Sequence, residues 1–291
     1  MKSLLQQATL VIFGLASLTF MAHAAEAPAK VAADKVAPAQ WPAMATVGDP
    51  LAQALLARAY LYGMDGQSRS TKDAAAWAKK SGAQNHPLGL FVQGCCLYFD
   101  WTRPTEAREN ESRPYFDKAA REGFQKRAEQ EGRQWMGMLG DACFFGLGIP
   151  KSEAEAVKCW RKAAAAGDTN AMASLGYVYQ EGTGVPKDQK KAIDWFQKAA
   201  ALGDACGLFA MGVCTLQGNG IPKDEPEAVQ SFLRAADAGS PYAMFWLGYC
   251  HENGLGVMTN EDEATKWYRK AADLGDARAK EALEKLQGVE K

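Results

Sequence analysis

The 291-residue sequence lacks the features that mark several large classes of protein. It has only three histidines, which leaves little material for a histidine metal site. Lysine and arginine (33) balance aspartate and glutamate (34), so the basic excess that binds nucleic acids or anionic membranes is missing. The motifs of serine hydrolases, P-loop proteins, zinc proteases and dithiol oxidoreductases are missing as well. We therefore expect no catalytic, cofactor or metal site, and no nucleic-acid partner.

Long apolar runs are also missing, apart from one near the N-terminus. Lys2 precedes the apolar segment 8–22, and an A-x-A cleavage pattern ends at Ala24. This layout predicts a signal peptide over residues 1–24 that is cleaved after Ala24. A retained membrane anchor is the alternative, although the run is shorter than the ~20 residues of a spanning helix. We expect a periplasmic or secreted protein with no transmembrane segment after cleavage.

A period of 36 residues organises most of the chain. One glycine series consists of Gly167, Gly203, Gly239 and Gly275, and another of Gly140, Gly176, Gly212 and Gly248. Periods of 20–50 residues indicate stacked supersecondary units. The predicted order after the signal peptide is a flexible Ala/Pro-rich linker (25–48), two degenerate helical repeats (49–132), four regular repeats (133–276) and a C-terminal capping helix with a tail (277–291).

Each repeat reads as two short helices joined by a turn. In one unit, Asp168 is predicted to cap the first helix, Gly182 to end it and Asp188 to cap the second. Tyr179 and Trp195 are expected to fill the space between neighbouring units. The second-helix caps of the other units are Ser152, Asp224 and Asn260, and the glutamates with capping-box spacing are Glu155, Glu227 and Glu263. The eight residues in excess of the period, within 124–133, are expected to extend a helix or form a loop.

The repeat has a specific sequence pattern. It reads A-x-x-x-L-G-x-x-Y-x-x-G-x-G-V-P-x-D and then K-A-x-x-W-F-x-K-A-A-x-x-G over Ala171–Gly203. This pattern resembles the Sel-one-like repeat family, a branch of the tetratricopeptide-like helical solenoids, strongly over about 133–287 and weakly over 49–123. The resemblance implies an all-α fold: a right-handed α-α superhelical solenoid of about six helix-turn-helix repeats plus the capping helix. It also implies a non-catalytic scaffold or adaptor for protein–protein interaction.

Some units depart from the family pattern at two positions. Cys143, Thr215 and His251 replace the residue equivalent to Tyr179, and Cys159 and Ser231 replace the residue equivalent to Trp195. We expect looser local packing in these units without a change of fold.

A partner-binding surface is suggested by analogy with tetratricopeptide units, in which the first helix of each pair lines an inner groove. Several inward positions of this chain are apolar or aromatic, as in an interaction surface. The predicted partner-binding groove consists of Tyr177, Phe209, Val213, Leu216, Tyr242, Phe245, Tyr249 and Glu252. We expect it to bind an extended or helical segment of another protein. Burial of the rings against one another, or self-association through the same patch, are the alternatives.

Seven cysteines are present, an odd number for an exported chain. Cysteine-rich members of the family place one cysteine near the end of the second helix, where this chain has Ala164, Ala200, Ala236 and Ala272. We therefore interpret most of the cysteines as small buried apolar residues. The resemblance leaves one enzymatic alternative, because some cysteine-rich members bind or weakly hydrolyse β-lactams.

Overall fold

A computed structural model of the chain describes residues 38–62, 70–98, 100, 105–130 and 133–286. Within these residues the regular secondary structure consists of one 3₁₀ helix and 15 α-helices, with no strand, so the predicted all-α fold is confirmed. The predicted signal peptide and most of the predicted linker lie outside the described residues. None of the helices in the described part combines the length and the apolar composition that a membrane crossing needs.

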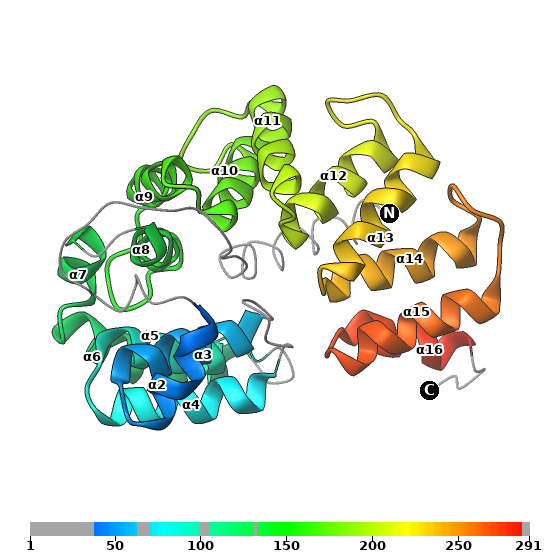
Figure 1. Cartoon of the computed structure of the whole chain (residues 1–291). Coiled ribbons are helices and arrows are strands. Elements are labelled where there is room, and N and C mark those ends of the chain that lie inside the picture. Colours follow the sequence, from blue (N-terminus) through cyan, green and yellow to red (C-terminus); the bar gives the residue numbers. More distant parts are fainter. Residues whose placement is uncertain (1–37, 63–69, 99, 101–104, 131–132, 287–291) are drawn as a thin grey trace. The chain divides into compact units, whose positions relative to one another are not determined.

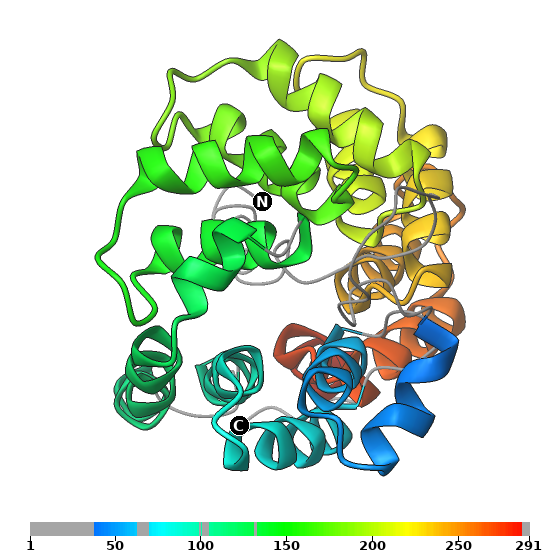
Figure 2. The same cartoon turned by 60° about the vertical axis from the view of Figure 1, so that its left-hand side comes forward.

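In chain order the helices are η2 (Pro38–Gln40), α2 (Trp41–Thr46), α3 (Pro50–Tyr62), α4 (Thr71–Ala83), α5 (Pro87–Tyr98), α6 (Thr105–Arg121), α7 (Phe124–Gln130), α8 (Arg133–Phe145), α9 (Glu153–Ala165), α10 (Thr169–Glu181), α11 (Gln189–Ala201), α12 (Ala205–Gln217), α13 (Glu225–Asp237), α14 (Pro241–Asn253), α15 (Glu261–Asp273) and α16 (Ala277–Leu286). Figure 1 gives their labels, and Figure 2 shows the same helices from a second direction.

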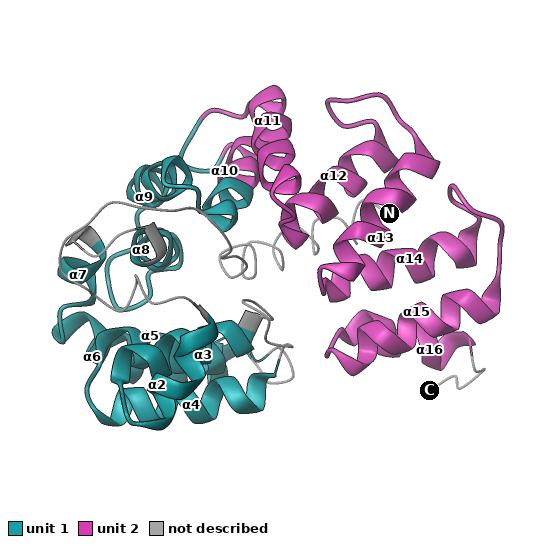
Figure 3. Cartoon of the chain, viewed as in Figure 1, with its two compact units in different colours: residues 1–174, 183–185 teal, residues 175–182, 186–291 magenta. Residues whose placement is uncertain are grey.

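The chain divides into two compact units (Figure 3). Unit 1 consists of residues 1–174 and 183–185, and unit 2 consists of residues 175–182 and 186–291. In unit 1, α3 to α6 each pack against the next helix, and α8 packs against α9. In unit 2, α11 to α16 do the same. Packing between sequence neighbours is the arrangement of a helical-repeat solenoid.

The end of the predicted linker is ordered. Trp41, the first residue of α2, is buried, and α2 packs against α3. The Gln53 side-chain amide of α3 donates a hydrogen bond of 3.0 Å to the Ala45 carbonyl. Ala45 also packs with the buried Leu56. Residues 38–46 therefore differ from a flexible linker, because burial of a large ring offsets the entropy of ordering this short segment.

A glycine and an aromatic ring set the spacing of the two helices in a repeat. A methyl group on Gly212 of α12 would lie 2.6 Å from the Phe232 ring of α13, so only glycine lets the helices approach this closely. Phe232 is fully buried. The same contact joins Gly94 to Phe116, Gly140 to Trp160, Gly176 to Phe196 and Gly248 to Tyr268. Trp195, the expected space-filling residue, is instead half-buried, with the Lys198 ammonium 4.2 Å from its ring centre.

The predicted helix caps are confirmed. The Asp188 carboxylate accepts a hydrogen bond of 3.0 Å from the Lys191 backbone N–H, and Asp168 accepts one of 2.9 Å from Ala171. Ser152, Asp224 and Asn260 accept the equivalent bonds in the other units. Gly182 has φ +78°, the left-handed conformation expected where a first helix ends.

The predicted capping boxes are wrong. A capping box needs the glutamate to bind the free backbone N–H of the cap residue. Here that N–H is already used, because Ser152 donates it to the Cys143 carbonyl at 2.7 Å. Glu155 instead accepts a hydrogen bond from Lys158 at 2.6 Å. The same backbone bond joins Asp188 to Tyr179, Asp224 to Thr215 and Asn260 to His251, so it fixes the turn of each regular repeat.

The excess over the period forms a separate short helix, α7, rather than an extension or a loop. Gly123, with φ +87°, precedes it. Phe124 of α7 is buried and stacks on Phe91 of α5, with ring centres 4.4 Å apart. It also contacts Trp135 of α8 at 5.7 Å. The insertion therefore adds a buried ring to unit 1.

The close approach of α12 and α13 predicts the effect of adding one methyl group. Gly212→Ala should lower the free energy of unfolding by roughly 2–3 kcal/mol, because the methyl group collides with the Phe232 ring. Gly239→Ala is the matched control: a methyl group there meets no atom within 4 Å, although φ is +87°. It should cost only about 1 kcal/mol, the strain of the left-handed conformation. Urea unfolding measures the free energy of unfolding of both variants. Equal losses of stability would contradict the proposed collision with the Phe232 ring.

Candidate functional site

The eight residues of the predicted partner-binding groove all lie in unit 2, on the first helices of their repeats. The structure buries four of them: Tyr177, Phe209, Leu216 and Phe245. Val213, Tyr242 and Tyr249 are half-buried, and Glu252 is exposed. The prediction of a continuous exposed apolar set is therefore wrong for the four buried residues, and the alternative, in which rings pack against one another, describes them.

Ring contacts between helices explain this burial. Phe209 of α12 is 1% exposed, and its ring centre lies 6.1 Å from that of Tyr242 in α14. It also lies 5.8 Å from Phe232 of α13. Phe245 is 6% exposed and lies 5.5 Å from Tyr268 of α15. These two phenylalanines join consecutive helices of unit 2, so they are not free to receive a partner.

The other two buried residues lie within the same unit. Tyr177 is buried with its ring 4.8 Å from Phe196, and burial raises the pKa of its hydroxyl well above the usual value. Leu216 is buried near the end of α12. Position along one helix could not reveal this burial, because it depends on the neighbouring helices.

Arg278 of α16 is an additional residue of this surface that the sequence reasoning missed. Its guanidinium lies 4.5 Å from the Phe245 ring centre and 5.1 Å from that of Tyr242. The Asp276 carboxylate pairs with it at 2.6 Å, and also accepts a hydrogen bond from the Ala279 N–H at the start of α16. Arg278 lies 36 residues after Tyr242, so extending the period into the capping helix would have found it.

Glu252 and Tyr249 lie close together near the end of α14. The exposed Glu252 accepts a hydrogen bond of 2.5 Å from the Tyr268 hydroxyl, which joins α14 to α15. Burial and this carboxylate raise the pKa of Tyr268. Tyr249 packs edge-on against Trp246 at 5.5 Å and remains half-buried. The far end of α14 therefore offers a partly exposed ring beside an exposed carboxylate.

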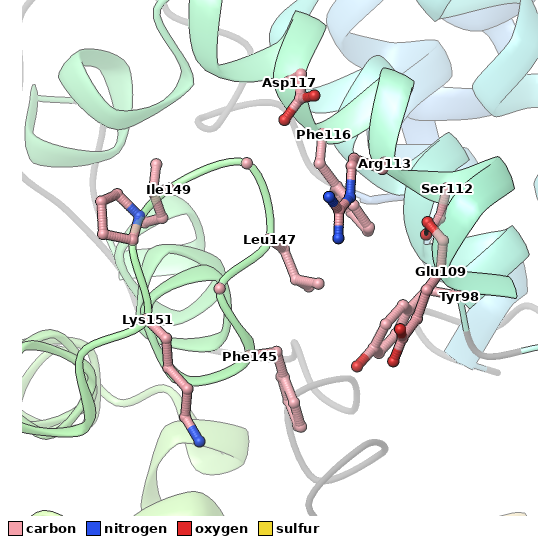
Figure 4. Close-up of a pocket in the computed structure, with 13 residues that line it drawn as sticks. Tyr98, Glu109, Ser112, Arg113, Phe116, Asp117, Phe145, Leu147, Ile149 and Lys151 are labelled. Carbon is pink, nitrogen blue, oxygen red and sulfur yellow. Dashed lines mark hydrogen bonds between the residues drawn. The ribbon is translucent and has the colours of Figure 1, made fainter. Parts of the chain in front are cut away.

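Unit 1 contains a separate pocket of about 660 Å³, shown in Figure 4. It lies between α6 and the segment from Phe145 to Lys151. The residues that line the pocket carry charges of both signs: Glu109 and Asp117 are acidic, and Arg113 and Lys151 are basic. This balanced lining gives no preference for an anion or a cation.

No disulfide joins any of the seven cysteines, all of which lie in the described part of the chain, and most of them are buried. Five are buried, as predicted, and Cys96 and Cys206 are half-buried. Burial raises the pKa of Cys96, Cys214 and Cys250 to about 12. A thiol with such a pKa stays protonated at neutral pH and is a poor nucleophile. Among the described residues, no group of three or more His, Cys, Asp and Glu side chains could bind a metal ion.

The repeats match a known family model. The Sel1 repeat model matches residues 50–86, 136–168, 169–204, 207–240 and 241–276, more than half of the sequence. The chain belongs to the Sel1 repeat family. Proteins of this family are helical repeat scaffolds that generally lack catalytic activity and typically mediate contacts between proteins. The Sel-one-like resemblance of the sequence is therefore confirmed.

Solved structures of other Sel1 repeat proteins are similar to this chain. A Sel1 repeat protein from Oxalobacter formigenes is 26% identical with a TM-score of 0.50, over 84% of this chain and 68% of that one. A protective antigen of uropathogenic Escherichia coli strains, described as having an SLR fold, is 25% identical with a TM-score of 0.48. That match covers 87% of this chain and 59% of the antigen. No curated protein matches the sequence.

The buried His86 predicts a pH dependence of stability. Burial, and then the positive charge of Arg127, lower its pKa from 6.5 to about 4, while Asp49 acts in the opposite direction. Between these two values the unfolded chain binds more protons than the folded chain, so stability falls as the pH falls through this window. His86→Gln should reduce the stability lost between about pH 7.5 and about pH 4.5 by roughly 2 kcal/mol.

Urea unfolding at the two pH values measures this difference. His251→Gln is the control, because His251 is half-buried rather than buried. If the His86 variant loses as much stability as the parent protein between these two pH values, the burial of His86 does not cause the pH dependence of stability.

Proposed function

We propose that this Sel1 repeat protein is a non-catalytic scaffold of the bacterial periplasm or secreted fraction that binds a segment of another protein along the first helices of unit 2. The family supports the scaffold role. The leader pattern ending at Ala24 supports export. The β-lactam alternative receives no support from the sequence, because the place where cysteine-rich members of the family have a cysteine holds alanine in this chain (Ala164, Ala200, Ala236 and Ala272).

The observation that carries the binding proposal is the contrast between rings on α14. Phe245 is buried and fixed by its neighbours, whereas Tyr242 and Tyr249 remain half-buried. We call Val213, Tyr242, Tyr249 and Glu252 the tyrosine surface. Partly exposed tyrosines suit protein contacts, because the ring offers apolar area and the hydroxyl offers a hydrogen bond at a low entropic cost.

Charges at the two ends of α14 extend this surface. The Arg278 guanidinium covers part of the Tyr242 ring, and its ion pair with Asp276 fixes its position before any partner binds. Glu252 provides an exposed carboxylate near the other end of the helix. A bound segment would therefore meet a cation at one end and an anion at the other, with ring surface between them. Groups fixed in advance lower the entropic cost of binding.

Photo-crosslinking in cells tests the location of the tyrosine surface. A benzophenone amino acid at position 249 should yield a covalent adduct with a second protein, because this side chain is partly exposed. The same group at Arg269, an exposed residue of α15, is the matched control and should yield none. Mass spectrometry then identifies the adduct: a different protein supports the proposal, and a second copy of this chain indicates self-association instead.

Removing the tyrosine rings should prevent capture without unfolding the chain. We expect the combined change Tyr242→Ser and Tyr249→Ser to abolish copurification of the protein identified by crosslinking. Trp267→Ser is the matched control, because it removes a half-buried ring from the second helix α15. Circular dichroism checks that both variants remain helical. If the same amount of partner copurifies with the tyrosine variant, the proposal that the tyrosine surface binds the partner is refuted.

Export has its own test. Full-length protein expressed in a Gram-negative bacterium should be recovered from the periplasm or the medium with Ala25 as its first residue, because cleavage is predicted after Ala24. Deletion of residues 2–24 should leave the protein in the cytoplasm. Amino-terminal sequencing and cell fractionation make these measurements, and an uncleaved protein in the membrane fraction would show that the leader is an anchor.

A further inference from the structure

The turn between α8 and α9 brings two cysteines together. The backbone bond from Ser152 to the Cys143 carbonyl, 2.7 Å long, fixes this turn. Further along the pair, the Trp160 indole N–H donates a hydrogen bond of 2.9 Å to Asp141, and the Trp160 ring fills the space beside Gly140. This register places Cys143 of α8 opposite Cys159 of α9, and the two thiols form a hydrogen bond.

Both cysteines occupy positions that are aromatic in the next repeat. Cys143 is equivalent to Tyr179, and Cys159 is equivalent to Trp195. In that repeat the two rings interact with lysines, Lys191 over Tyr179 and Lys198 over Trp195. In the α8–α9 repeat two small thiols replace the two large rings, so the side chains at these positions can meet each other directly.

The two thiols share one environment, which distinguishes them from the other buried cysteines. Each is 8% exposed, so neither is fully removed from solvent. The hydrogen bond to Cys159, and then burial, raise the pKa of Cys143. By contrast, burial alone raises the pKa of Cys214. Adjacent thiols with some access to solvent meet two requirements for thiol–disulfide exchange, contact and access.

We propose that Cys143 and Cys159 form an intramolecular disulfide that cross-links α8 and α9 when the folded protein meets a small disulfide such as oxidised glutathione. Cys159 attacks first, as its thiolate, because its hydrogen bond with Cys143 and burial keep the Cys143 thiol protonated. The attack on a glutathione sulfur breaks the glutathione S–S bond and releases one glutathione thiolate, which takes up the proton. The second cysteine then attacks the protein sulfur of this mixed disulfide and releases the second glutathione. Two protein S–H bonds and one S–S bond are exchanged for one protein S–S bond and two glutathione S–H bonds.

The cross-link goes beyond the scaffold function and is independent of it, since the two thiols lie in unit 1 and the tyrosine surface lies in unit 2. It closes a short loop that contains the α8–α9 turn, so it restricts the unfolded chain. The oxidised protein should therefore have a Tm roughly 5 °C above that of the reduced protein. An oxidising compartment after export would supply the small disulfide.

Tryptic digestion of the native protein tests the pairing directly. Cleavage after Arg133, Lys151, Lys158 and Arg161 places Cys143 and Cys159 in separate peptides, 134–151 and 159–161, with no other cysteine in either. Reduced protein is incubated with excess oxidised glutathione, alkylated and digested without reductant. We expect a linked pair of these two peptides and an intact mass about 2 Da lower than that of the reduced protein, the loss of two hydrogens.

Two variants control the experiment. Cys159→Ser should eliminate both the linked peptides and the rise in Tm. Cys214→Ser removes a buried thiol of unit 2, and this variant should still give the linked peptides and the rise in Tm. Because the wild-type protein alone shows whether the linked peptides form, the result does not depend on the folding of a variant. Recovery of Cys143 or Cys159 only as free thiols, only as glutathione adducts, or linked to other cysteines would overturn the proposal.

Discussion

The contact between a glycine on the first helix and an aromatic ring on the second determines how each repeat packs. In unit 2, Gly212 and Gly248 face Phe232 and Tyr268, and an added methyl group would lie 2.6 Å from either ring. The ring is buried in each repeat, and it can contact the next repeat as well, as Phe232 contacts Trp246. The packing of one repeat and the stacking of repeats thus depend on the same side chain.

This use of aromatic residues also limits the surface that remains for a partner. Phe209 and Phe245 contact adjacent helices, and Arg278 covers the end of the series. Among the aromatic residues of the predicted groove, only Tyr242 and Tyr249 of α14 remain partly exposed. The binding surface of such a protein is therefore what stacking leaves uncovered, and its extent depends on the helix that follows.

Local features of the fold could be predicted from the sequence, and features that depend on neighbouring helices could not. The cap at Asp188 and the left-handed Gly182 depend on a few consecutive residues, and both were predicted correctly. The space-filling role was predicted for Trp195, whereas the structure buries its neighbour Phe196 completely, because adjacent residues have the same period and only packing distinguishes them. The burial of Phe209 and Phe245, and the contact of Arg278 with the candidate site, arise between repeats, so spacing within one helix carries no information about them.

The turn of every regular repeat depends on a bond between two main-chain groups, such as the one from Asp188 to Tyr179. The accepting carbonyl belongs to cysteine, tyrosine, threonine or histidine in successive units, and the bond forms in each case. The geometry of the turn is therefore indifferent to the side chain at this position. The side chain at this position can therefore differ from one repeat to the next without a change in the fold.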